Sequence, residues 1–344
     1  MSQKAFVTGA SGFVGSHVVR ELHAQGWEVH VLARSTSNLE ELAEIPFELH
    51  VGDVTDADSV FKAMPRQVDA VFHVAASTNF WSRKNEEQTR INVTGTHNMV
   101  EAAIEADAGR FIHTSSFVTW GFPGVEVNEN SPRDSSSDWI NYVKTKHVSE
   151  CEVLKATADG WLDAVVLNPA NVLGPGDWRN WSRVFRMVDQ QKIPGAPPGG
   201  GNFCDVREVA KAHVRAFHDG GKGEKYLLGG EFARIVDVLA IAGEMMNKPV
   251  PERPMPVWLL QASARLMTAI SLLTGKEPDL TPEAAVMASR DIICNSGKAE
   301  QELGYRSVPL RTMIRDTIDW MKDKGMLQCL SLIHISEPTR PTRA

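Results

Sequence analysis

The sequence predicts an α/β protein in which a doubly wound parallel sheet is joined to a smaller C-terminal lobe that binds the substrate. In the first half, short β-branched apolar runs alternate with helical patterns, which is typical of parallel strands with crossover helices. A glycine-rich turn follows the first predicted strand directly. Beyond Pro169, clusters of proline and glycine break the chain into shorter elements. We therefore expect a first domain over residues 1–168 and a lobe over 169–328, with some elements of the lobe returning to the sheet.

Each expected element of the first domain follows from its local hydrophobic period. Strands are expected over Lys4–Thr8, Glu28–Ala33, Phe47–Val51, Ala70–Val74, Arg110–His113 and Asp163–Asn168. Helices are expected over Val14–Gln25, Asp56–Ala63, Glu86–Ala106 and Asp138–Ala158.

One apolar segment of the lobe needs a separate interpretation. The run from Val257 to Leu273 is strongly apolar, but Gln261 and Arg265 interrupt it and it is shorter than a usual membrane span. We expect an amphipathic cover helix, with a membrane-contacting helix as the alternative, and no integral membrane span.

Composition excludes several classes of protein. The 344 residues, 42% hydrophobic and 23% charged, are typical of a folded globular chain. The net charge of -7 gives no general attraction to nucleic acid, so no nucleic-acid partner is expected. The four cysteines are far apart and the helical histidines lack ligand spacing, so we expect reduced thiols and no metal. The N-terminus shows no signal core, and a cytoplasmic location is expected.

The C-terminal run from Leu330 to Arg340 resembles the translation of a sequencing adapter. Residues 329–344 are therefore expected to be a non-native tail and are excluded from fold reasoning. The natural terminus stays open.

The glycine-rich turn predicts a dinucleotide site. Gly9 permits a tight turn, Gly12 allows close backbone approach to a pyrophosphate, and Gly15 allows the helix to pack on the strand. The helix amino terminus adds N–H groups and a positive dipole. Residues 1–168 are thus expected to form an NAD(P)-binding domain of the Rossmann type. The cofactor contacts expected from the strand ends and the turn are Gly9, Ser11, Gly12, Phe13, Val14, Gly15, Arg34, Asp53, Val54, Ala75 and Ala76.

The end of the second predicted strand bears on the choice of cofactor. An NAD site usually has an acidic residue there for the ribose 2′-hydroxyl, but this chain has Arg34. A guanidinium can hold a 2′-phosphate with charge-assisted hydrogen bonds. NADP(H) is therefore expected over NAD(H), although a solvated surface arginine would look the same.

Three further residues suggest carbonyl chemistry. Tyr142 and Lys146 are four residues apart and therefore share one face of the long helix. The ammonium is expected to lower the pKa of the tyrosine, which would help it exchange a proton near neutral pH. Ser116 follows the fifth strand at the ligand-binding edge and could hydrogen-bond the reacting oxygen.

Several longer motifs connect the predicted site with a known protein family. The run HVAASTNFW (residues 73–81), the segment INVTGTHNMVEAA (91–103), NPANVLGPG (168–176), FCDVREVA (203–210) and GEKYLLGG (223–230) stand in this chain. With the glycine turn and the tyrosine and lysine, they make the chain resemble an extended short-chain dehydrogenase/reductase over about residues 4–325. Within the NAD(P)-dependent epimerase/dehydratase family it is similar to the dihydroflavonol 4-reductase-like branch.

The resemblance implies a catalytic tetrad. Tyr142 would be the general acid, Lys146 would hold the ribose and lower the tyrosine pKa, Ser116 would orient the carbonyl, and Asn92 would support a proton relay. It also implies hydride transfer from the nicotinamide to the carbonyl carbon. The segment from Pro169 to Val172 would pass beneath the nicotinamide. The resemblance therefore adds Tyr142, Lys146, Pro169 and Val172 to the expected cofactor contacts.

Departures from the family pattern narrow the expected reaction. Sugar dehydratases of the family carry acidic residues after the catalytic serine or threonine, whereas Phe117 and Val118 follow Ser116 here. Epimerases usually place an arginine for the sugar diphosphate where this chain has Gly201. Aromatic residues lie in segments expected around the site, and they suit an apolar or aromatic carbonyl compound. The residues expected to contact the substrate are Phe80, Trp81, Phe117, Trp120 and Trp178.

The leading hypothesis is an NADPH-dependent reductase of a ketone or aldehyde on a hydrophobic substrate, aromatic ones included. The alternatives are a nucleotide-sugar epimerase with retained NAD(P) and a non-catalytic NADP(H)-binding sensor. The resemblance also suggests a homodimer formed through the helices over 86–106 and 138–158.

Overall fold

The computed structural model describes residues 2–133 and 135–327, and the tail expected over 329–344 lies outside them. Its main sheet has seven strands in the order β3-β2-β1-β4-β5-β6-β9. All neighbouring strands of this sheet run parallel. The order reverses direction at β1, which is the topology of a doubly wound Rossmann sheet. The predicted fold class is confirmed.

The predicted strands of the first half are confirmed to within about one residue at each end. The strands are β1 (Lys4–Thr8), β2 (Glu28–Ala33), β3 (Glu48–Val51), β4 (Ala70–His73), β5 (Arg110–Thr114), β6 (Ala164–Pro169), β7 (Asn171–Leu173), β8 (Gly200–Asp205), β9 (Lys225–Leu228), β10 (Phe232–Arg234) and β11 (Asp291–Ile292). The α-helices are α1 (Phe13–Ala24), α2 (Ala57–Ala63), α3 (Asn85–Thr89), α4 (Gly95–Glu105), α5 (Asn141–Ala158), α6 (Trp181–Asp189), α7 (Val206–His218), α8 (Ile235–Met246), α9 (Val257–Thr274), α10 (Pro282–Met287), α11 (Gly297–Glu302) and α12 (Leu310–Asp323). Short helical turns complete the described part at η1 (Glu40–Leu42), η2 (Ser82–Lys84), η3 (Arg90–Thr94) and η4 (Phe117–Trp120).

Two predicted helices differ from the structure for local reasons. The helix expected over 86–106 is divided into α3 and α4 by a single π-helical turn, η3. The helix expected from Asp138 begins at Asn141, because Ile140 has an extended backbone. The N–H of Ile140 donates a hydrogen bond to the Asp138 carboxylate, which holds this turn before the helix.

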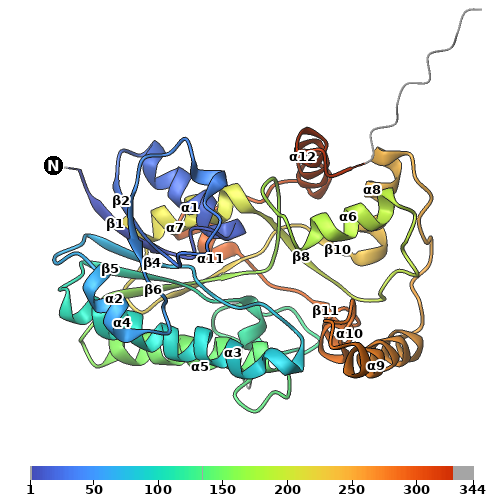
Figure 1. The fold of residues 1–344 in the computed structure, drawn as a ribbon, viewed down its shortest axis with the longest axis horizontal. Coiled ribbons are helices and arrows are strands. Elements are labelled where there is room, and N and C mark those ends of the chain that lie inside the picture. The colour runs from blue at the N-terminus through green and yellow to red at the C-terminus, as the bar shows by residue number, and fades with distance from the viewer. Residues whose placement is uncertain (1, 134, 328–344) are drawn as a thin grey trace, which may run out of the picture.

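Helices cover both faces of the main sheet. Figure 1 shows α1 and α7 on one face and α2, α4 and α5 on the other. The strands between them are apolar on both sides, as parallel strands must be, and Phe6, Phe72 and Phe111 are completely buried. This packing holds the carboxyl ends of the strands at one edge, where the site lies.

The second half forms a lobe and also returns to the main sheet. Strand β8 is the centre of a small sheet, with β7, β10 and β11 as its neighbours. Helices α6, α8 and α12 pack around it with their own apolar core, which includes Phe185, Leu239 and Ile314 (Figure 1). Strand β9 pairs with β6 and so joins the main sheet.

Helix α9 is the one helix in the described ranges that is long and apolar enough, by length and composition, to cross a membrane. It was expected to cover the lobe with its apolar side. Only a narrow stripe, which includes Leu260 and Ala264, packs toward Ala285 of α10. Trp258 and Leu273 are exposed to solvent instead. The apolar residues of α9 are therefore mostly not part of the core.

Candidate active site

The glycine turn forms a tight cradle at the start of α1. Gly9 has a φ of +77°, and a Cβ there would lie 2.6 Å from the Ala75 backbone nitrogen. A Cβ on Gly15 would lie 2.1 Å from the Gly9 carbonyl oxygen, so the helix can approach the turn only without a side chain. No side chain caps α1, and its first turn has no acidic residue. The exposed N-terminus therefore fits the pyrophosphate of a dinucleotide, as predicted.

Other predicted cofactor residues lie at neighbouring strand ends. Ala75 follows β4, and its N–H donates to Thr8 Oγ1 over 3.3 Å, which ties it to the glycine turn. Asp53 follows β3 and accepts hydrogen bonds from the Thr55 N–H and hydroxyl, both over 2.9 Å. Arg34 follows β2 and is exposed. The remaining predicted contacts fall in the same segments: Ser11, Gly12, Phe13 and Val14 at α1, Val54 after β3, Ala76 after β4, Pro169 at the end of β6, and Val172 in β7.

One hydrogen bond in this region involves a residue that was not predicted to belong to the site. His17 lies on α1, and its Nε2 donates to the Pro175 carbonyl over 2.9 Å. Burial lowers the pKa of His17 to about 4, so the ring is neutral at pH 7. The bond fastens the pyrophosphate helix to the segment that follows β7. From the sequence, His17 was one of the helical histidines that lack ligand spacing, and no role was predicted for it.

Tyr142 and Ser116 are brought together as predicted. Tyr142 lies in the first turn of α5, and its hydroxyl forms a hydrogen bond with the Ser116 side chain. Ser116 is the N-cap of η4, directly after β5. The ring of Phe80 meets the Tyr142 ring edge-on, with centroids 5.4 Å apart. A hydroxyl pair beside an aromatic wall can therefore hydrogen-bond a carbonyl oxygen on an apolar substrate.

The expected pKa of Tyr142 needs a correction. Lys146 was expected to lower it, but burial is the largest influence and raises the pKa above its ordinary value of 10. The Ser116 hydrogen bond acts in the opposite direction. Tyr142 is thus held in the protonated form, as an acid requires.

Lys146 is buried one turn further along α5. Its Nζ donates to the Thr114 carbonyl over 2.7 Å, so the ammonium lies beneath the end of β5. Burial lowers the pKa of Lys146 to about 8, while the Glu150 carboxylate acts to raise it. The ammonium therefore remains mostly charged at pH 7.

Glu150 is the functional residue that sequence reasoning missed. It is completely buried one turn after Lys146, so Tyr142, Lys146 and Glu150 follow one another at four-residue spacing. The four-residue spacing was the signal in the sequence from which Glu150 could have been predicted. Its carboxylate accepts hydrogen bonds from Ser115 Oγ over 2.6 Å and Asn168 Nδ2 over 2.8 Å, and it pairs with Arg133.

Asn168 connects this carboxylate to the serine. The same Asn168 amide that donates to Glu150 also donates to the Ser116 carbonyl over 3.1 Å. The end of β6, the serine turn and the middle of α5 are therefore held in one buried polar network.

Asn92 lies in the π-helical turn η3 and is buried. Its side chain accepts from the Ser77 N–H over 2.7 Å and donates to the Ser77 carbonyl over 3.0 Å. It also donates to Thr145 Oγ1 of α5 over 3.1 Å. Asn92 thus fastens the loop after β4 to the catalytic helix, and its role in a proton relay stays a prediction.

The aromatic residues predicted to contact substrate have different surroundings. Phe80 packs against the Tyr142 ring, as described above. Trp81, the next residue in the chain, is half-buried, and the Arg83 guanidinium lies 5.7 Å from the centre of the Trp81 ring. Phe117 is buried next to Ser116. Trp120 is buried between the cations of Arg133 and Lys225.

Trp178 lies in a different environment. Its exposed ring packs edge-on against Trp320 of α12, with centroids 5.0 Å apart. Trp178 therefore packs between elements of the lobe. Of the five predicted substrate residues, Phe80 has a ring contact with Tyr142 within the described ranges.

Comparison with known proteins agrees with this site. The NAD dependent epimerase/dehydratase family matches residues 5–229. Sterol demethylase protein B of Methylococcus capsulatus is 31% identical over 93% of this chain and 99% of its own. A Synechocystis protein that carries the provisional name dihydroflavonol 4-reductase is 29% identical, over 95% of this chain and 97% of its own. The crystal structure of gox2253 superposes with a TM-score of 0.82 at 32% identity, over 95% of this chain and 100% of that one.

The family match covers the glycine cradle, the serine, the tyrosine and the lysine, and the relatives confirm the predicted resemblance. This chain belongs to the NAD dependent epimerase/dehydratase family of extended short-chain dehydrogenases/reductases and is an NAD(P)-dependent oxidoreductase.

Proposed function

We propose that the protein is an NADPH-dependent reductase that converts a ketone or aldehyde on a hydrophobic substrate into an alcohol. The observation that carries the proposal is the arrangement around Tyr142. Its protonated hydroxyl is paired with Ser116, and the ring of Phe80 packs edge-on against its own ring. This suits an apolar carbonyl compound better than a sugar diphosphate.

The predicted catalytic residues would have separate roles in such a reduction. Ser116 and Tyr142 would hydrogen-bond the carbonyl oxygen, and Tyr142 would then give it the proton. Lys146 would stabilise the phenolate that forms, because its ammonium is buried one turn away. A nicotinamide held by the glycine cradle would supply the hydride. The raised pKa of Tyr142 favours this direction, since an acid must be protonated before the step.

The choice of NADPH depends on Arg34. Its exposed guanidinium follows β2 at the edge where a ribose 2′-phosphate would be held, and no carboxylate in residues 2–133 and 135–327 is seen paired with it. The names of the relatives support an apolar substrate, because a sterol and a dihydroflavonol are both fused-ring compounds of low charge.

A cofactor-consumption assay tests the proposal. NADPH oxidation is measured with aryl ketones, dihydroflavonols, ketosteroids and UDP-sugars, with NADH in parallel. The proposal predicts oxidation of NADPH with at least one apolar carbonyl compound. Isomerised UDP-sugar without net cofactor consumption would instead make the protein an epimerase, and binding of NADPH without turnover of any substrate would support a sensor.

A further inference from the structure

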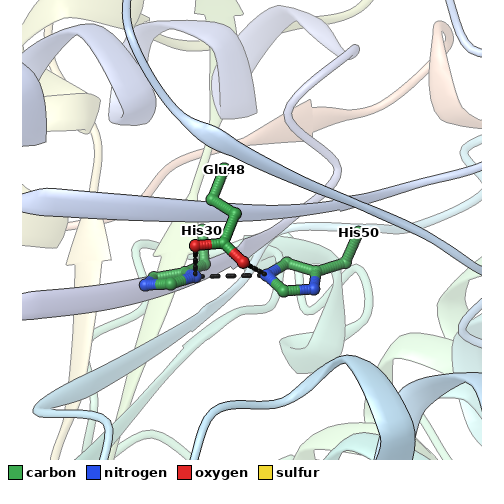
Figure 2. Close-up of side chains that lie close together, drawn as sticks. All are labelled: His30, Glu48 and His50. Carbon is green, nitrogen blue, oxygen red and sulfur yellow. Dashed lines mark hydrogen bonds and ion pairs between the residues drawn. The ribbon is translucent and has the colours of Figure 1, made fainter.

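Three potential metal ligands converge at the edge of the main sheet, away from the catalytic residues. Figure 2 shows the side chains of His30, Glu48 and His50 directed at one another. His30 lies on β2 and faces Glu48 across the strand pair, and His50 follows Glu48 by two residues on β3. Alternate residues of a strand point to the same face, so the three side chains share one side of the sheet.

The distances between the donor atoms match a metal site. His30 Nδ1 lies 3.1 Å from His50 Nε2, and each of these nitrogens lies 3.4 Å from a Glu48 carboxylate oxygen. Tetrahedral Zn²⁺ with bonds of 2.0–2.1 Å places neighbouring ligand atoms about 3.3 Å apart. The two nitrogens therefore have the spacing of neighbouring zinc ligands, and each of them faces a different oxygen of the Glu48 carboxylate, Oε2 for His30 and Oε1 for His50.

A fourth residue supports this assignment independently. The other ring nitrogen of His30, Nε2, lies 3.1 Å from Glu28 Oε1. Metal-binding histidines usually donate their second N–H to a carboxylate in this way, which leaves the first nitrogen free to bind the metal. Glu28 thus orients His30 Nδ1 toward Glu48 and His50.

The cluster is also accessible and has a suitable charge. His30 is buried, while the Glu48 side chain is 62% exposed, so a fourth ligand such as water could enter from solvent. The Glu48 carboxylate supplies negative charge beside the two imidazole rings, which suits a divalent cation.

We propose that His30 Nδ1, His50 Nε2 and the Glu48 carboxylate form a binding site for Zn²⁺ that is separate from the active site. The ion would fasten the edge strand β3, whose residues are largely exposed, to β2. Two residues after His50, the chain enters Gly52 and Asp53, which are expected at the cofactor. The prediction that the protein binds no metal was based on the cysteines and the helical histidines. It did not include this cluster, because His30, Glu48 and His50 come together only when two strands pair.

Binding of Zn²⁺ alone to the full chain, first stripped with a chelator, tests the site by calorimetry. The expected result is one saturable site, a higher melting temperature with Zn²⁺, and intense visible absorption when Co²⁺ replaces Zn²⁺ in a tetrahedral site. Glu48→Gln and His50→Ala should each weaken binding at least about tenfold. Glu28→Gln should weaken it by about 10- to 100-fold, as loss of an orienting partner does.

A matched control separates this site from another pair of donors. Cys151 lies 3.5 Å from His147 on α5, and Cys151→Ser should leave the zinc affinity unchanged. Glu48 is exposed, so Glu48→Gln is expected to keep the fold, which circular dichroism checks. No saturable binding, or equal affinity in wild type, Glu48→Gln and His50→Ala, would overturn the proposal.

Discussion

Lys146 and Glu150 lie one helical turn apart on α5, and the buried Glu150 carboxylate acts to raise the pKa of the Lys146 ammonium. Burial acts in the opposite direction and is the larger influence, so the pKa is lowered to about 8 even with the Glu150 carboxylate in place. The charge of the Lys146 ammonium therefore depends in part on the buried carboxylate of Glu150.

Glu150→Gln should reduce activity at alkaline pH. Without the carboxylate the pKa of Lys146 falls further, so the ammonium is lost at a lower pH and the alkaline limb of the kcat/KM profile moves to lower pH. Activity at pH 8 should fall severalfold while activity at pH 6 changes less. The half-buried Glu152, which pairs with His97, offers the control Glu152→Gln, whose profile should match wild type. Equal profiles for the two variants would contradict this role.

Gly15→Ala should abolish cofactor binding, because its Cβ would lie 2.1 Å from the Gly9 carbonyl oxygen. Gly12→Ala is the graded comparison, since its Cβ would lie 3.1 Å from the same oxygen and could be relieved by a small shift. Fluorescence titration with NADPH measures both affinities. If Gly15→Ala bound as tightly as wild type, the cradle would not be the pyrophosphate site.

Arg34→Ala should weaken NADPH binding about 10- to 100-fold and leave NADH binding nearly unchanged. A charge-assisted hydrogen bond to the 2′-phosphate contributes about 1.5–3 kcal/mol, which corresponds to that ratio. Arg66→Ala, which removes another exposed arginine, is the control. A parallel loss for both cofactors, or for neither, would show that Arg34 does not recognise the 2′-phosphate.

Histidines whose pKa values are lowered by burial should make the fold sensitive to acid. Burial lowers the pKa of His73 to about 3 and the pKa values of His17 and His213 to about 4, against an ordinary value of 6.5. The unfolded chain then binds more protons than the folded one between about pH 4 and 6.5. Stability is therefore complete above pH 6.5 and is lost as the pH falls, by up to about 1.4 kcal/mol per pH unit for each histidine.

Urea unfolding at several pH values between 8 and 5 measures this loss. His97 is exposed, and His97→Ala should show the same pH dependence as wild type. A free energy of unfolding that stays constant from pH 7 to 5 would mean that these histidines do not limit acid stability.

Local sequence signals were sufficient for the strands and the glycine cradle. The strands are continuous apolar runs, and the cradle needs three glycines at a fixed spacing, so both can be read without knowledge of distant contacts. Tyr142 and Lys146 were found for the same reason, because four residues along a helix place them on one face.

Features that depend on distant contacts could not be predicted in this way. The π-helical turn at Asn92 is supported by Ser77 and Thr145, and the small sheet around β8 joins strands from four parts of the lobe. The predicted direction of the Tyr142 pKa shift was wrong, because the sequence shows the nearby lysine but not the burial of the tyrosine.

The most direct test of the account is the comparison of Tyr142→Phe with wild type in NADPH oxidation by an apolar ketone, together with NADPH affinity. The account predicts that kcat falls at least about a hundredfold, as loss of a general acid does, while NADPH binding stays within about threefold. Turnover at the wild-type rate in Tyr142→Phe would contradict the assignment of Tyr142 as the proton donor.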